Sequence, residues 1–100
     1  MDEVLLEELK LYCGITWEDP VTDRQVRTLM ENGMAFLDLK RGAPADYHTP
    51  GLPRSLLMDY VRSGRAEALD VFEENYLSLI TAMQNERRVK DCESAQPPQP

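Results

Sequence analysis

The chain has 100 residues and a mass of 11.5 kDa, which is the size of a single domain. Its 11 basic and 18 acidic residues give a net charge of −7, which argues against a nucleic-acid groove binder and against binding to anionic membranes, since both need a basic surface. No apolar run approaches the roughly 18 to 20 residues that span a bilayer, and two cysteines make no disulfide framework, so we expect a soluble intracellular protein.

The chain opens with a pattern typical of an amphipathic helix. Apolar residues recur every three or four positions over 2–12, and Gly14 follows as a residue that can end the helix in the left-handed conformation. The connector over 15–21 is rich in turn-forming residues, but Ile15 and Trp17 within it are apolar. We expect both side chains to hold the connector against the core.

A second helix is predicted over 23–41. Thr22 and Gln25 have the spacing of a capping box that starts it. Gly33 lies within the apolar stripe of this helix, where glycine costs roughly 1 kcal/mol relative to alanine. We therefore expect Gly33 to allow the close approach of another helix or a slight bend.

The third and fourth helices follow the longest internal loop, residues 42–52. A stretch of this length without regular structure is typical of a binding surface or a flexible tip in a small domain. The third helix is predicted to start at Pro53, to be buried on most sides and to break or kink at Ser63-Gly64. The fourth is predicted over 66–89, which is long enough for part of it to project beyond the domain.

Together these elements predict an all-α fold, a small bundle of about four helices with a long C-terminal helix. No segment of useful length has the period of a strand, so the core is expected to form by helix-on-helix packing. Residues 1–90 form the predicted helical domain. Residues 91–100 are polar and proline-rich, which predicts a disordered tail.

Few residues in the sequence have the spacing of catalytic or metal-binding groups. Cys13 and His48, the only histidine, could in principle form a nucleophile and its base, but His48 lies in a turn-rich loop and nothing around Cys13 indicates an activated thiol. Two cysteines and one distant histidine also lack the spacing of a zinc site, and adjacent acidic residues on a helix do not face one another. We therefore expect no enzyme activity, no metal and no cofactor.

Helix-turn-helix DNA binding is an alternative for a small helical chain. The only basic cluster is Arg87, Arg88 and Lys90, and the dipole of a helix end explains it more simply. Residues 66–76, in contrast, carry four acidic residues and no basic one. Such a patch suits a basic partner, or the lining of a channel that must not grip DNA, although a plain soluble surface would look the same.

The segment LKLYCGITWEDPVTDRQV resembles the opening of bacteriophage head–tail connector proteins, also called DNA-packaging adaptors. In that family a short helix is followed by a turn and a long second helix. Residues 11–19 here correspond to the turn, and residues 22–39 correspond to the second helix. The buried third helix and the long last helix, over 53–88, also match. The resemblance covers about residues 4–88, and its motifs are packing and capping signals. The chain departs from the family in its short connector and its proline-rich 42–52 loop, which bears on the partner it meets more than on the fold.

The resemblance implies a structural virion protein that catalyses no reaction. Such subunits form a homo-oligomeric ring beneath the portal protein, extend the DNA channel and dock a stopper or tail-completion protein. DNA would pass through without sequence-specific binding, and no membrane would be involved. The protein would be found in the bacterial cytoplasm during assembly and at the head–tail junction of the virion.

We expect the contacts with other subunits or the portal to use the long internal loop and the fourth helix. The candidate interface residues are Asp46, Tyr47, His48, Glu67, Asp70 and Glu74. The alternative is a small acidic regulator that binds a host protein, with its charge imitating that of DNA. Ring formation and portal binding would argue against that alternative.

Overall fold

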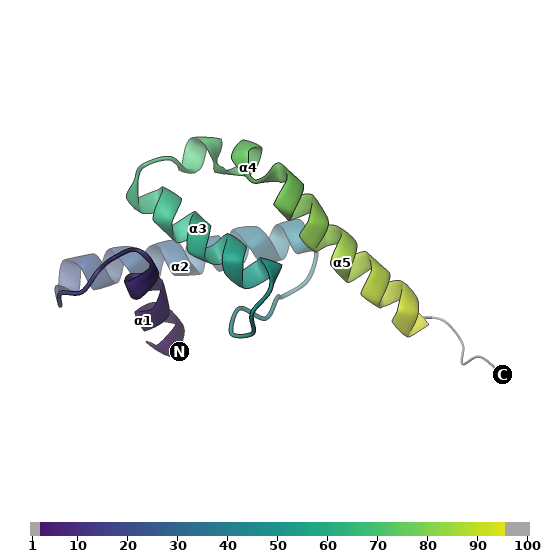
Figure 1. The fold of residues 1–100 in the computed structure, drawn as a ribbon, viewed down its shortest axis with the longest axis horizontal. Helices are drawn as coiled ribbons and strands as arrows, with labels where there is room; N and C mark the ends of the chain where they lie inside the picture. The colour runs from purple at the N-terminus through teal and green to yellow at the C-terminus, as the bar shows by residue number, and fades with distance from the viewer. Residues whose placement is uncertain (1–2, 96–100) are drawn as a thin grey trace.

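A computed structural model describes residues 3–95, and these residues form helices and no strand (Figure 1). The elements are α1 (Glu3–Tyr12), α2 (Pro20–Arg41), α3 (Leu52–Arg65), the short 3-10 turn η1 (Leu69–Val71), α4 (Phe72–Asn75) and α5 (Leu77–Ala95). The predicted all-α bundle is confirmed. The predicted fourth helix, however, is divided into η1, α4 and α5.

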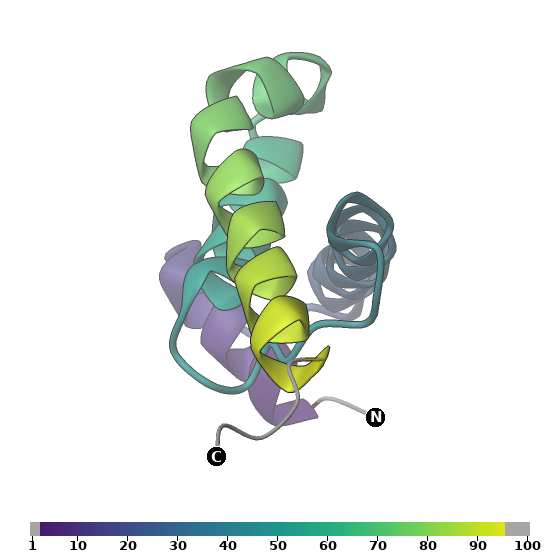
Figure 2. The same cartoon turned by 90° about the vertical axis from the view of Figure 1, so that its right-hand side faces the viewer.

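Helix α3 lies at the centre of the bundle and packs against α1, α2, α5 and η1. Its side chains Leu56, Leu57 and Val61 are fully buried. Figure 2 views α2 nearly along its axis, beside the rest of the bundle, with α5 running in front of α3. The prediction of a third helix that is buried on most sides is therefore confirmed.

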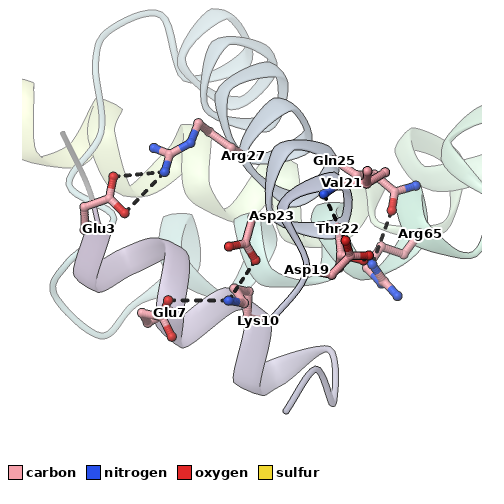
Figure 3. A network of polar contacts seen from close by, with 10 residues as sticks. All are labelled: Glu3, Glu7, Lys10, Asp19, Val21, Thr22, Asp23, Gln25, Arg27 and Arg65. Carbon is pink, nitrogen blue, oxygen red and sulfur yellow. Dashed lines mark hydrogen bonds and ion pairs between the residues drawn. The ribbon is translucent and has the colours of Figure 1, made fainter. Parts of the chain in front are cut away.

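Helix α1 packs against α2, and charged contacts between the two helices are drawn in Figure 3. Leu5, Leu6 and Leu9 of the predicted apolar stripe of α1 are buried, whereas Tyr12, which continues the same spacing, is 43% exposed. Lys10 is only 4% exposed, and its ammonium pairs with Asp23 of α2 at 2.8 Å and with Glu7 at 3.5 Å. The Asp23 carboxylate raises the pKa of Lys10, so this buried amine stays charged and paired.

Helix α2 begins three residues earlier than predicted, because Asp19 caps it instead of Thr22. The Asp19 carboxylate accepts the backbone N–H of Val21 at 3.2 Å and the hydroxyl of Thr22 at 2.8 Å. Pro20 then occupies the first helical turn, where its missing N–H costs nothing. Thr22 thus acts as a donor to the cap, and both residues suit a helix start when only the sequence is considered.

Two glycines allow α2 and α3 to pack closely. A Cβ on Gly33 would lie 2.7 Å from Tyr60 Cδ1 and 2.8 Å from Leu57 Cδ1, so the predicted close approach is confirmed. A Cβ on Gly64 would lie 2.4 Å from Leu29 Cδ2. Gly64 is not the break that the sequence predicted, since α3 continues through it to Arg65.

The predicted fourth helix is interrupted at Tyr76, where four aromatic rings meet. Phe72 of α4 is buried, and its ring lies 4.7 Å from the stacked Tyr76 ring, 5.2 Å from Tyr60 and 6.1 Å from Phe36. Aromatic pairs at these separations stabilise a core beyond their buried area. Packing of this cluster therefore overrides the helical periodicity that predicted one continuous helix.

The connector and the C-terminal segment each differ in part from the prediction. Ile15 is buried as expected, but Trp17 is half exposed and does not hold the connector against the core. Helix α5 extends to Ala95, so the part of the predicted tail over 91–95 is helical. The remaining residues of that tail lie outside the described residues.

Candidate interaction surfaces

The loop between α2 and α3 is held by the side chain of Tyr47. Tyr47 is 2% exposed, and its hydroxyl donates to Asp38 Oδ1 at 2.6 Å. The hydroxyl oxygen of Tyr47 also lies 3.2 Å from the carbonyl oxygen of Met34. Asp38 also accepts the backbone N–H of Ala45 at 3.0 Å. Burial and the Asp38 carboxylate together raise the pKa of the Tyr47 phenol far above its ordinary value, so it remains a donor. The side chain of this candidate interface residue is buried within the bundle and anchors the loop.

The other two candidates in the loop, Asp46 and His48, are exposed. The Asp46 carboxylate accepts the backbone N–H of His48 at 2.9 Å and the Thr49 hydroxyl at 2.6 Å. Both hydrogen bonds lower the pKa of Asp46, and the bond from the Thr49 hydroxyl has the larger effect. His48 is therefore exposed on a turn that the hydrogen bonds of Asp46 hold in one conformation.

Two arginines that flank the loop donate hydrogen bonds to its backbone. Arg41 donates to the carbonyl oxygens of Ala43 and Pro44, at 3.4 and 2.6 Å. Arg54 donates to the carbonyl oxygen of Tyr47 at 3.1 Å and pairs with Glu8 of α1. The loop is thus bonded at several points along its length, which differs from the flexible tip that its composition allowed.

The three acidic candidates lie far from the loop, around the turn between α3 and α4. Glu67, Asp70 and Glu74 are all exposed. Glu67 has a φ of 57°, the only positive φ outside glycine among the described residues, and it turns the chain after α3. In Figures 1 and 2 this turn is at the top of the molecule and the loop is below it, so the two candidate groups form separate surfaces.

The structure also has an apolar groove between α2 and α3 that the sequence analysis did not identify. We call it the α2–α3 groove. It has a volume of about 330 Å³ and is lined by Val21, Arg24, Gln25, Thr28, Leu29 and Gly64. Val21 beside it is 70% exposed. Its shape depends on the contact between Leu29 and Gly64, which a sequence pattern alone does not indicate.

Large apolar side chains are exposed on several other elements. Among the most exposed are Leu39 at 80%, Val4 at 68%, Leu11 at 66% and Leu77 at 56%. Single exposed apolar side chains are normal on a protein surface. Here they are spread over α1, α2 and α5.

The titratable groups of the chain give little support for catalysis at Cys13. Burial raises the pKa of the Cys13 thiol, which keeps it protonated, whereas a nucleophilic cysteine needs a lowered pKa. Within residues 3–95, no three His, Cys, Asp or Glu side chains form a group that could hold a metal ion. None of the helices in this part of the chain combines the length and apolar character needed to cross a membrane.

Comparison of the chain with known proteins found no match among protein-family models, curated proteins or solved structures.

Proposed function

We propose that this chain is a subunit of a bacteriophage head–tail connector, an adaptor that forms a ring beneath the portal protein. In this role it extends the DNA channel and docks a stopper or tail-completion protein at the head–tail junction of the virion. The sequence resemblance over residues 4–88 is one support. The resemblance lies in the order of the helices and in their capping residues. A subunit that catalyses no reaction would share these features with its relatives and would have no catalytic residues to share.

The observation that carries the proposal is the spread of exposed large apolar side chains over three helices of this small bundle. Apolar side chains are exposed on α1, α2 and α5, and α5 extends past the rest of the bundle toward the C-terminus (Figure 1). A ring subunit needs contacts with two neighbouring copies, with the portal on one side and with the next protein on the other. A regulator that binds one host protein needs a single face.

The charge of the chain supports the same role. A net charge of −7 and the exposed carboxylates of Glu67, Asp70 and Glu74 disfavour adhesion to DNA. A channel that DNA must cross functions best without strong binding to it. The chain therefore suits passage of DNA without sequence-specific recognition.

The test is affinity capture of the tagged protein from bacteria in which the phage is assembling, followed by mass spectrometry. Portal protein together with capsid or tail-completion protein in the eluate is the expected result. Capture of a host enzyme or polymerase subunit without any virion protein would favour the acidic regulator and overturn the connector role.

A second step with purified portal protein makes the result specific. Native mass spectrometry of the mixture should show several copies of this chain on one portal ring. His48→Ala, at the exposed turn of the loop, should reduce the number of copies bound if this loop meets the portal. Asn32→Ala, at an exposed position of α2, is the matched control and should bind as the unchanged chain does.

A further inference from the structure

We propose that the α2–α3 groove of one copy of this chain receives the η1–α4 segment of a second copy. The inference rests on the proposed function, since it names the contact that would join neighbouring subunits of the ring. In this contact the exposed Val71 packs against Leu29 and Val21, and the carboxylates of Asp70 and Glu74 face Arg24 and Arg65.

The rim of the groove carries positive charge that has no partner within the described chain. Arg24 is exposed, and Arg65 donates to Gln25 Oε1 at 3.3 Å (Figure 3). No carboxylate among the described residues forms an ion pair with either arginine. The groove therefore has an apolar floor and a rim suited to an acidic segment with an apolar side chain at its centre.

Unpaired cations are unexpected in a chain with 18 acidic and 11 basic residues. Several other basic residues pair with acids, such as Arg27 with Glu3, Lys40 with Glu73 and Arg54 with Glu8, whereas Arg41 and Arg88 form no ion pair with a described residue. The two arginines at the groove both adjoin Gln25, Arg24 along the chain and Arg65 through its hydrogen bond, and neither has a carboxylate partner among the described residues. A carboxylate from another molecule could form ion pairs with both arginines.

The η1–α4 segment has the chemistry that the groove fits. Val71 is 39% exposed, and Asp70 and Glu74 beside it are exposed as well. The region over 66–76 contains no basic residue. Buried Phe72 and the 2.6 Å ion pair between Glu73 and Lys40 hold the segment on its own bundle, so it is presented ready-formed to a neighbour.

The two surfaces share no residue, although the end of α3 borders the groove and leads into η1. The groove lies between the first half of α2 and the end of α3, whereas α4 is at the top of the view in Figure 1, close to the start of α5. A copy can therefore receive a segment in its groove and give its own segment to the next copy. Contacts of this head-to-tail kind form closed rings when the rotation between copies closes, and a ring is what the proposed function requires.

Cysteine cross-linking of the purified protein tests the contact directly. In a background with Cys13→Ser and Cys92→Ser, one preparation carries Val21→Cys and a second carries Val71→Cys. Oxidation of the mixture at high protein concentration should give a disulfide-linked dimer that contains one chain of each kind. In the control, Leu39→Cys replaces Val21→Cys; it lies on the same helix about 27 Å along the axis and should not link to Val71→Cys. Equal linking in both mixtures would overturn the proposal.

Charge reversal gives a second and independent readout. Arg24→Glu with Arg65→Glu, and separately Asp70→Arg with Glu74→Arg, should each abolish self-association measured by sedimentation. A mixture of the two double variants should restore it, since each groove then meets a segment of opposite charge. Circular dichroism confirms that both variants are folded, and unchanged self-association of either one would contradict the proposal.

These outcomes are distinguishable from failure of the proposed function. If the cross-link forms but affinity capture yields no virion protein, the contact between copies stands and the connector role fails. If capture yields the portal but neither the cross-link nor the charge effect is seen, the connector role stands and the ring must use another surface.

Discussion

At the residue scale, Gly33 shows how a position that weakens a helix stabilises the whole bundle. We expect Gly33→Ala to lower the free energy of unfolding by about 1–2 kcal/mol, because overpacking outweighs the roughly 1 kcal/mol gained in helix propensity. Leu57 is fully buried and the Tyr60 ring packs against Phe36 and Phe72, so neither side chain can move aside easily. Urea unfolding followed by circular dichroism measures the change.

The control for this substitution is Asn32→Ala at the neighbouring exposed position of α2. It gains helix propensity without entering the interface, so it should leave stability unchanged or raise it by a few tenths of a kcal/mol. A Gly33→Ala variant that is more stable than the unchanged chain would show that α2 and α3 are not closely packed at this position.

Tyr47 allows the hydroxyl that anchors the loop to be tested apart from its ring. Tyr47→Phe keeps the buried ring but leaves Asp38 without its 2.6 Å donor, and we expect a loss of about 1–2 kcal/mol in the free energy of unfolding. Tyr60→Phe is the matched control, since the Tyr60 hydroxyl has no hydrogen-bond partner among the described residues, and it should cost less than about 0.5 kcal/mol. Equal losses in both variants would mean that the hydroxyl of Tyr47 does not stabilise the loop.

At the element scale, the start of α2 gives the chain a specific sensitivity to acid. The Thr22 hydroxyl and the Val21 N–H lower the pKa of Asp19, so the folded state favours its ionised form. A lowered folded pKa contributes stability above the ordinary pKa, and that contribution is lost as the pH falls through the folded value. Asp19→Asn should therefore reduce the melting temperature at pH 7, and the difference should close below about pH 4. A difference that stays constant to pH 2 would contradict this origin.

Helix α5 is expected to contribute to stability mainly through its first two turns. Its buried side chains, Ile80 and Met83, lie there, and Gln84 donates to the carbonyl oxygen of Lys40 at 2.8 Å. Truncation after Arg88 should change the free energy of unfolding by less than about 0.5 kcal/mol, whereas Met83→Ala should cost about 2–5 kcal/mol. A large loss on truncation, measured by thermal unfolding, would show that the end of α5 packs on the bundle.

The elements also show what periodicity can and cannot predict. The buried faces of α1, α2 and α3 follow from the three-to-four spacing of their apolar residues, because each face must pack against another helix. The cap at Asp19 was missed because Thr22 is an equally good cap in isolation. The break at Tyr76 was missed because it depends on aromatic rings from α2 and α3, which are distant in the sequence.

Some features of the candidate surfaces can also be predicted from the sequence, and others cannot. The exposure of Asp46 and His48 follows from the turn-forming composition of their loop. Sequence spacing does not show that Tyr47 between them turns inward to meet Asp38, or that Leu29 and Gly64 form a groove. Such features depend on how two helices are placed relative to one another, so they appear only in the folded chain.

At the scale of the whole molecule, the net charge of −7 and the proposed contact between copies act in opposite directions. Repulsion between copies is long-range, and salt near 0.1 M, with a screening length of about 10 Å, already weakens it. The pairs between the groove arginines and the Asp70 and Glu74 carboxylates are short-range, and they weaken strongly only toward 1 M, where the screening length is about 3 Å. Self-association should therefore rise between low and moderate salt and fall again at high salt.

Sedimentation velocity over a series of salt concentrations measures this dependence. The variant with both Arg24→Ala and Arg65→Ala keeps the apolar floor of the groove but lacks the attractive pairs. Its weaker association should rise steadily with salt, because only the repulsion between copies remains to be screened. A maximum at moderate salt in the unchanged chain and its absence in the variant would assign the attraction to these two arginines. A steady rise in both would mean that the contact between copies is apolar alone.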